Sequence, residues 1–170
     1  MIYLIADLHI NHEKIIQYCN RPFSSVNEMN EVLIGNWNDT ISEDDKVFFL
    51  GDFICGPSKD ILAKNVFDIL NGKKIFLRGN HDRSVKSIKF VEKPIRFEYR
   101  GVKIICTHEP IDGYFPEDIN IHGHIHNNYE IKSEKHFILF ACGIIIVGVI
   151  ILLFNYYRVA KLVEFKRTII

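Results

Sequence analysis

The chain has 170 residues, of which 48% are apolar and 25% are charged, so it is long enough for one domain with a buried core and too short for two. Its 21 Lys and Arg residues balance its 21 Asp and Glu residues, which excludes an overall electrostatic field that would attract nucleic acid or an acidic membrane. The sequence therefore predicts a single domain over residues 1–170, whose specificity for any anionic ligand must come from local groups.

The cysteines and the N-terminus indicate where the protein is located. Cys19, Cys55, Cys106 and Cys142 lie far apart and form no C-x-x-C pair, which is typical of a reducing compartment. The first nine residues, MIYLIADLH, have no basic region before the apolar run and meet a charge at Asp7, so they predict a strand and not a signal peptide. We therefore expect a cytoplasmic protein.

Short apolar runs, rich in β-branched and aromatic residues, predict the strands. The expected strands cover residues 2–6, 47–50, 73–77, 95–99, 102–106 and 119–121. The turn residues Arg100-Gly101 separate the fourth run from the fifth, which predicts a hairpin.

Three helices are expected between the first three strands. Asn11 can cap a short helix, and Ser25 with Glu28 forms a capping box before a second one, whose apolar residues follow helical spacing. Ser58 can cap the third helix, which ends at Asn71-Gly72. Strands that alternate with helices imply an α/β sheet, in which ligands bind beyond the carboxyl ends of the strands.

Polar side chains that can bind metal ions follow five of the predicted strands. Alternation along an extended segment would place Asp7 and His9 on one face. The candidate metal ligands are Asp7, His9, Asp52, Asn80, His108, His124 and His126. Oxygen and nitrogen donors without sulfur suit borderline cations such as Mn²⁺, Fe, Zn or Ni better than Mg²⁺, which prefers oxygen and water. The sequence therefore predicts a site for two divalent ions.

Two neighbouring ions need a shared ligand, and the carboxylate of Asp52 can provide it. A carboxylate can bridge ions roughly 3.5–4 Å apart, and a water held between them loses a proton near neutral pH. The resulting hydroxide can attack a phosphate ester in line, so that no Ser or Cys nucleophile is required.

Five motifs occur in a characteristic order. They are D-x-H (7–9), G-D (51–52), G-N-H-D (79–82), a lone His (108) and G-H-x-H (123–126). This order resembles the calcineurin-like metallophosphoesterases, and DLHINH and HGHIHNN are most similar to small bacterial and phage members without a cap domain. The resemblance spans residues 1 to about 128. It implies a four-layer α-β-β-α sandwich of two mixed sheets flanked by helices, and a metal-dependent phosphoesterase acting on phosphomonoesters or phosphodiesters.

The resemblance also implies a role for each residue of the site. One ion would be held by Asp7, His9, Asp52 and His126, and the other by Asp52, Asn80, His108 and His124. His81, oriented by Asp82, would protonate the leaving alkoxide or stabilise the transferring phosphoryl group. The implied cofactor is a pair of divalent ions, Mn²⁺ ahead of Fe, Zn or Ni. The implied partner is a phosphate-ester substrate such as a nucleotide or a nucleic-acid end.

Several other side chains allow two interpretations. His122 shares a strand face with His124, so spacing alone allows it as a ligand, whereas the resemblance favours the two histidines that follow it. His12 and Arg21 could touch a substrate phosphate or could simply be solvated. Basic residues around the G-N-H-D turn could attract an anionic substrate or form a solvated face. They are Arg78, Arg83, Lys86 and Lys89.

The segment from Phe137 to Phe154 departs from the family pattern because it has eighteen residues without a charge. That length is the lower limit for a membrane-spanning helix, so a membrane-anchored phosphoesterase is one alternative. Lys and Arg on both flanks oppose it, because a single span cannot keep both flanks in the cytosol. The Ile and Val content, with breaks at Gly143 and Gly148, favours two core strands. A second alternative, a non-catalytic metal-site scaffold, is disfavoured by the complete donor set.

Overall fold

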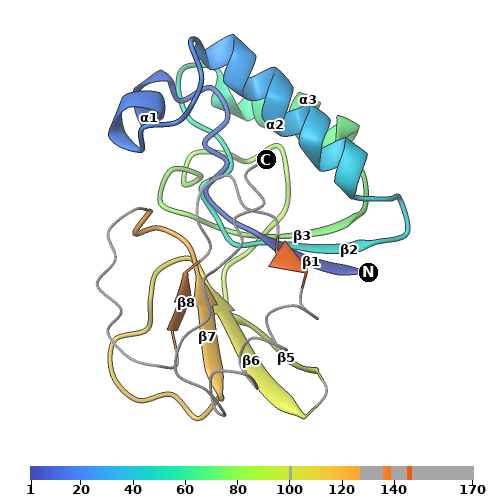
Figure 1. The fold of residues 1–170 in the computed structure, drawn as a ribbon, viewed down its shortest axis with the longest axis vertical. Coiled ribbons are helices and arrows are strands. Elements are labelled where there is room, and N and C mark those ends of the chain that lie inside the picture. The colour runs from blue at the N-terminus through green and yellow to red at the C-terminus, as the bar shows by residue number, and fades with distance from the viewer. Residues whose placement is uncertain (100, 127–135, 139–144, 147–170) are drawn as a thin grey trace.

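The computed structural model describes residues 1–99, 101–126, 136–138 and 145–146. They form two β-sheets that pack against each other, with helices on the opposite face of the first sheet (Figure 1). The helices are α1 (Glu13–Tyr18), α2 (Val26–Thr40) and α3 (Lys59–Ile69). The predicted α/β class with two sheets and flanking helices is confirmed, and within the described ranges all helices belong to one of the two outer layers.

The first sheet carries the alternating strands and helices of the N-terminal half. Its strands are β1 (Ile2–Ile5), β2 (Lys46–Phe49), β3 (Lys73–Leu77), β4 (Phe90–Val91) and β9 (Ile145–Ile146). Their order is β4-β3-β2-β1-β9, and β1 to β4 are parallel whereas β9 is antiparallel to β1. Because β1, β2 and β3 run in the same direction, the loops that follow them lie at one edge of the sheet.

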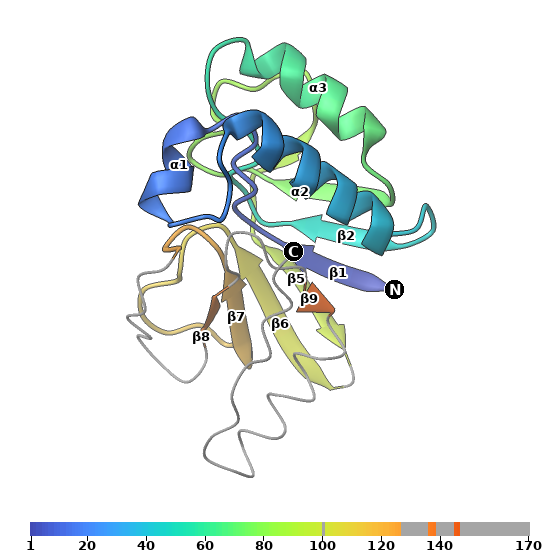
Figure 2. The ribbon, with the colours of Figure 1, turned by 45° about the horizontal axis from the view of Figure 1, so that its top comes forward.

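The second sheet contains the predicted hairpin. Its strands are β5 (Ile95–Tyr99), β6 (Val102–Thr107), β7 (Ile119–His122) and β8 (His136–Ile138), in that order. β5 and β6 pair antiparallel with Tyr99 opposite Val102, as the Arg100-Gly101 turn predicted. β6, β7 and β8 are parallel to one another, so the sheet is mixed. Figure 2 shows this sheet on the side of the first sheet that the helices leave uncovered.

The first sheet is apolar on both faces because both are covered. Along β1, Tyr3 and Ile5 pack into the core beneath the helices, whereas Leu4 packs into the core between the sheets. β2 continues the pattern in register, with Leu4 paired to Phe48. Runs that are buried on both faces read as continuously hydrophobic, which explains why these strands showed no polar alternation in the sequence.

The predicted capping box is present at the start of α2, but one of its two hydrogen bonds has a partner one residue earlier than expected. The Oγ of Ser25 accepts a hydrogen bond from the N–H of Glu28 at 3.2 Å. The Glu28 carboxylate accepts from the backbone N–H of Ser24 at 2.7 Å, one residue before the expected partner. The first bond satisfies an N–H group that a helix leaves unpaired at its N-terminus, and the second ties the preceding residue to the first turn.

The starts of α1 and α3 differ from the predicted caps. The N-cap position of α1 is His12, and Asn11 instead has a left-handed backbone with its N–H bonded to the side-chain oxygen of Asn30 at 2.9 Å. Ser58 does occupy the N-cap position of α3, but its backbone is left-handed and its side chain makes no capping hydrogen bond. Both helices are therefore held by packing on the first sheet and not by local capping.

Two short pieces of the predicted apolar run 137–154 are strands. Residues 137–138 belong to β8, which pairs with β7, and β9 pairs with β1. The remainder of the run, and with it the choice between core strands and a membrane span, lies outside the described residues. Within the ranges that the structure describes, no helix has the length and apolar character needed to cross a membrane.

Candidate metal centre

The predicted metal ligands converge where the loops after β1, β2 and β3 meet those after β6 and β7. Backbone bonds beyond the strands tie the loops together, because the N–H of Asp7 donates to Gly51 and that of His9 donates to Asp52, both at 3.0 Å. The N–H of His124 reaches the Asp7 carboxylate from the other sheet, at 2.9 Å from Oδ2. The site therefore joins the two sheets at one edge.

The ligand atoms form two adjacent groups. In each group the atoms lie within 4.8 Å of one another, a spacing at which they could hold a metal ion. The first group contains Asp7, His9 and His126, and the second contains Asp52, His108 and His124. The side-chain oxygen of Asn80 joins the second group, at 2.9 Å from Nε2 of His108 and 3.1 Å from Nδ1 of His124. All seven predicted ligands are thus brought together.

Asp52 lies between the two groups. Its Oδ2 is 3.4 Å from Nε2 of His108 in the second group and 3.6 Å from Nε2 of His9 in the first. The side chain of Asp52 is 1% exposed, so both contacts are made away from bulk water. A buried carboxylate between two sets of nitrogen donors has the geometry of a shared ligand.

Two buried nitrogen atoms of the first group fit a bound cation. Within the described part of the chain, Nε2 of His9 and Nδ1 of His126 are buried without a hydrogen-bond partner. A buried polar atom left unpaired costs about 1–3 kcal/mol, so natural proteins rarely keep one without a use. Nitrogen lone pairs that face two carboxylates are suitable metal donors, and we conclude that the residues present fit a divalent ion.

Burial is the main physical cause of the pKa shifts in the site. Burial lowers the pKa of His9 to about 2 and that of His126 to about 4, which leaves both rings neutral, the form that binds metal. Burial raises the pKa of Asp7 to about 7, with a contribution from Asp52. Burial also acts to raise the pKa of Asp52, but the hydrogen bond and charge of His108 outweigh it and lower that pKa to about 2. A cation would compensate the buried carboxylate of Asp7.

Most of the candidate ligands have a strained backbone. Asp7, His9, Asp52, His124 and His126 have φ values of 55°, 53°, 59°, 70° and 48°, all in the left-handed region. Such a conformation costs a non-glycine residue about 1–3 kcal/mol and persists where the surroundings enforce it, typically at functional sites. The predicted alternation of Asp7 and His9 on a strand face is therefore wrong, because β1 ends at Ile5 and the ligands lie on turns beyond it.

Comparison with known proteins agrees with this geometry. The family model described as calcineurin-like phosphoesterase matches residues 1–142, which include every candidate ligand. The chain belongs to the calcineurin-like phosphoesterase family. It is 48% identical over 131 residues to the uncharacterized protein MJ1445 of Methanocaldococcus jannaschii, covering 75% of this chain and 70% of that protein. The resemblance seen in the sequence is confirmed, and the protein is a metal-dependent phosphoesterase.

Two further proteins are similar to this chain over different shares of its length. The gene 66 protein of Mycobacterium phage L5 is 33% identical over 78 residues, covering 45% of this chain and 37% of the phage protein. The crystal structure of the protein of unknown function AQ665 from Aquifex aeolicus superposes with a TM-score of 0.63 at 26% identity, covering 83% of this chain and 89% of that one. The fold of this phosphoesterase is therefore shared over most of its length with a solved structure.

Asp82 of the phosphoesterase has a different position from the one expected. Its buried carboxylate accepts hydrogen bonds from the backbone N–H groups of Asp52 at 2.9 Å, Phe53 at 3.0 Å, Ile54 at 3.3 Å and Gly79 at 3.1 Å. This corrects the expectation that Asp82 orients the ring of His81. The carboxylate instead fixes the loop that presents Asp52, and the sequence motif could not show this because three of the four bonds run to backbone 28 to 30 residues away.

Arg21 is neither solvated nor directed at a substrate. Its guanidinium is buried and donates to the carbonyl oxygens of Leu8 and Asp7, both at 2.8 Å. These carbonyls belong to the left-handed turn that carries Asp7 and His9. Arg21 therefore supports the first ligand loop from behind and places a positive charge near the buried Asp7 carboxylate.

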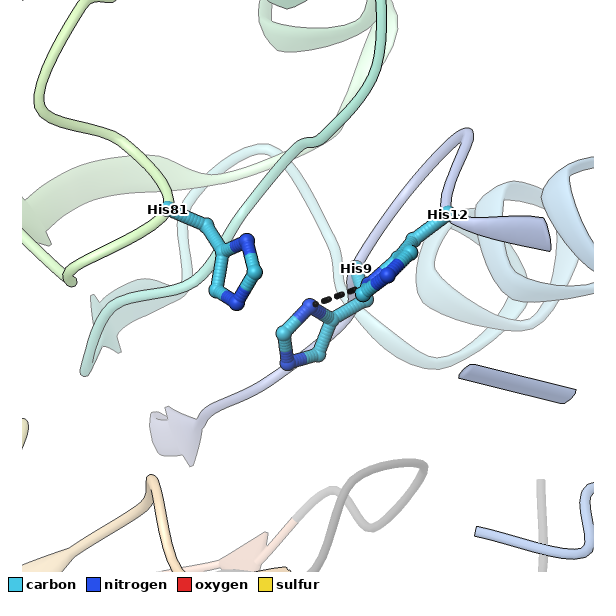
Figure 3. A group of neighbouring side chains, drawn as sticks. All are labelled: His9, His12 and His81. Carbon is cyan, nitrogen blue, oxygen red and sulfur yellow. Dashed lines mark hydrogen bonds between the residues drawn. The ribbon is translucent and has the colours of Figure 1, made fainter. Parts of the chain in front are cut away.

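His81 and His12 lie beside the ligands of the first group. Figure 3 shows the ring of His81 beside the rings of His9 and His12, which come from one segment before α1. Nδ1 of His12 is 3.2 Å from Nδ1 of His9, and the ring of His81 meets that of His9 edge-on with centroids 4.9 Å apart. The sequence left open whether His12 touches a substrate phosphate or is solvated, and the structure places it within the site. His122, the alternative ligand, has its Nδ1 at 3.0 Å from the carbonyl of Gly123 and falls outside both groups.

Two of the basic residues near the G-N-H-D turn, Arg78 and Arg83, have different surroundings. Arg78 is part of the structure, because it bonds to the Glu92 carboxylate at 2.7 Å and to the carbonyl of Asp82 at 2.8 Å. Arg83 is exposed and lines a cavity of about 290 Å³ that opens beside Asn80 and His108. Arg78 lines the same cavity, but its charge is paired with Glu92, whereas the exposed Arg83 is placed to attract an anionic substrate.

Gly123 is required by close approach, and replacing it should weaken the metal centre. A Cβ at this position would lie 2.5 Å from Oδ2 of Asp7 and 2.7 Å from Cβ of Ala6. We therefore expect Gly123→Ala to lower the free energy of unfolding by about 1–3 kcal/mol, as overpacking does, and to reduce the stabilisation that added Mn²⁺ gives. Urea unfolding with and without Mn²⁺ measures both effects.

Gly35→Ala is the matched control for this substitution. Gly35 is exposed on α2, and a Cβ there would meet nothing within 4 Å. Alanine should stabilise the helix by about 0.5–1 kcal/mol and leave the Mn²⁺ effect unchanged. Equal responses of the two variants to Mn²⁺ would show that Gly123 has no role at the metal centre.

Proposed function

We propose that the protein is a binuclear phosphoesterase in which Asp52 bridges two divalent ions. Asp7, His9 and His126 complete one ion site, and Asn80, His108 and His124 complete the other. The observation that carries this proposal is the position of Asp52 Oδ2, 3.4 Å from a nitrogen of one group and 3.6 Å from a nitrogen of the other. Mixed oxygen and nitrogen donors favour Mn²⁺, with Fe, Zn and Ni as other candidates.

The proposed reaction is hydrolysis of a phosphomonoester or phosphodiester. When bound, a pair of cations supplies neutralisation of the phosphoryl charge and a water of lowered pKa. The chain contributes the buried carboxylates and neutral imidazoles that hold the cations in place, and the loop bonds of Asp82 and Arg21 that keep these ligands in their strained conformations. We assign to His81 the transfer of a proton from its ring to the leaving oxygen.

The substrate class follows from the local charges. The chain has no net charge, so recognition of a phosphate ester depends on the metal centre and on Arg83 at the rim of the neighbouring cavity. A nucleotide or a nucleic-acid end fits these requirements, since each presents a phosphate ester together with an organic group that can enter the cavity. We place this activity in a single cytoplasmic domain.

Removal of metal should abolish the activity. With Mn²⁺ added, we expect hydrolysis of mono- or bis-nitrophenyl phosphate, and we expect a chelator to lower the rate by about 1,000-fold or more because the cations provide several kcal/mol of transition-state stabilisation. The measurement is nitrophenolate release before chelation, after it and after Mn²⁺ is restored. Rates that do not respond to chelation, or no turnover of either ester by the loaded protein, would contradict the proposal.

A further inference from the structure

A cysteine sulfur lies beside the ring of His81. The Asp82 carboxylate bonds to the Asp52 loop, and Sγ of Cys55 lies 3.6 Å from Nδ1 of His81. This distance is within hydrogen-bond range for sulfur. We propose that Cys55 is the positioning residue for His81: it holds Nδ1 and so leaves Nε2 to face the leaving oxygen. The inference rests on the proposed function and identifies a further residue of the same site.

The backbone of Cys55 is held against the first ligand loop. Its N–H donates to the carbonyl of Ile10 at 2.9 Å, and its carbonyl accepts from the side chain of Asn11 at 3.4 Å. An isolated β-bridge between Ile10 and Ile54 supports the same contact. The backbone that carries the sulfur is therefore fixed relative to the loop that carries Asp7 and His9.

His81 is fixed from the opposite direction. Its backbone N–H donates to Oδ1 of Asp52 at 2.9 Å, and its carbonyl accepts from Nζ of Lys59. The ring has the His9 ring at 4.9 Å and the His12 ring at 5.2 Å between centroids, as Figure 3 shows. Neighbouring rings on one side and the Cys55 sulfur at Nδ1 together restrict rotation of the imidazole.

A thiol can orient this imidazole without adding charge. In the protonated ring both nitrogens donate, with Nδ1–H directed at the sulfur and Nε2–H at the leaving oxygen. When the proton on Nε2 moves to the leaving alkoxide, the alkoxide becomes an alcohol and the ring becomes neutral while Nδ1 keeps its proton. The site already contains the buried carboxylates of Asp7, Asp52 and Asp82, so a neutral partner avoids a further buried negative charge.

Turnover of two esters by the full Mn²⁺-loaded chain tests this assignment. Proton donation matters more for a phenyl phosphodiester than for its nitrophenyl analogue, because phenolate is the more basic leaving group. We expect Cys55→Ala to lower kcat about tenfold on the phenyl ester with KM unchanged, and to change it less than about threefold on the nitrophenyl ester. Cys55→Ser, which keeps a polar group at this position, should restore the phenyl rate to within about threefold of the native one.

A second readout is independent of activity. Long-range ¹H–¹⁵N NMR of the metal-free chain, with the His81 signals assigned by their loss in His81→Ala, reports the ring tautomer. We expect one tautomer to predominate in the native chain and in Cys55→Ser, and a mixture of two in Cys55→Ala. Cys19→Ser is the control for replacing another half-buried cysteine and should match the native chain in both experiments.

The outcomes separate this inference from the proposed function. If the native chain hydrolyses neither ester, the proposed function fails, and the NMR comparison still tests the contact between Cys55 and His81. If the native chain is active and His81→Ala is impaired, but Cys55→Ala keeps the native phenyl rate and a single tautomer, only the assignment of Cys55 is overturned. Cys55→Val, which is apolar and of similar size, replaces the alanine variant if the latter does not fold.

Discussion

Asp52→Asn is expected to lower the turnover of both a phosphomonoester and a phosphodiester by about 1,000-fold or more. The asparagine keeps the shape of the side chain but replaces one carboxylate oxygen by an amide nitrogen, which donates hydrogen bonds and cannot bind a cation. Oδ2 of Asp52 faces nitrogen donors of both ligand groups, at 3.4 Å from His108 and 3.6 Å from His9. Loss of this atom should therefore affect both ions at once.

Metal content and rate, measured on the same preparation, test the Asp52→Asn prediction. Elemental analysis should show fewer than two equivalents of Mn²⁺ in the variant. His81→Ala should instead keep both ions and lose only rate. Asp44→Asn makes the same chemical change on a side chain that is 97% exposed, where it should leave rate and metal content at native values. Native rates for Asp52→Asn would exclude a bridging role for this carboxylate.

Asp82→Ala is expected to destabilise the metal-free protein strongly. It removes the acceptor of four buried backbone N–H groups, those of Asp52, Phe53, Ile54 and Gly79. Each buried donor left unpaired costs about 1–3 kcal/mol, so we expect a loss of about 4 kcal/mol or more, a large part of the 5–15 kcal/mol that stabilises a typical domain. Urea unfolding of the chelated chain measures this loss.

Asp60→Ala is the control for Asp82→Ala. The Asp60 carboxylate also accepts two backbone N–H bonds, from Lys86 at 2.6 Å and Ser87 at 2.8 Å, but these lie where water can replace it. Its loss should destabilise the chain much less than the loss of Asp82 does. Similar destabilisation by both variants would mean that Asp82 has no special part in holding the Asp52 loop.

The sequence predicts the elements and the ligand set because both depend on local patterns. The apolar runs of β1, β2 and β3 are short and continuous, since each strand is buried on both faces, and the polar residues that follow them mark the carboxyl edge. The assignment of His124 and His126 to different groups came from the family resemblance. Spacing suggested that His122 and His124 share a strand face, but β7 ends at His122, and His124 and His126 have a left-handed backbone.

The supporting residues of the site could not be predicted because their bonds are long-range. Nothing in the sequence around Arg21 shows that its guanidinium is buried against the carbonyls of Asp7 and Leu8. The same holds for Asp82, which follows His81 directly but turns to the backbone of another loop. Cys55 stands in a segment that reads as an ordinary turn, and its contact with His81 depends on how two strand-end loops meet.

The magnetic coupling between the ions, in protein loaded with two equivalents of Mn²⁺, tests the shared-ligand site most directly. Two Mn²⁺ ions bridged by a carboxylate lie roughly 3.5–4 Å apart and couple magnetically. Electron paramagnetic resonance should therefore show an exchange-coupled pair in the native chain and uncoupled Mn²⁺ in Asp52→Asn. Uncoupled ions in the native chain, or saturation at one equivalent, would contradict a binuclear centre built on Asp52.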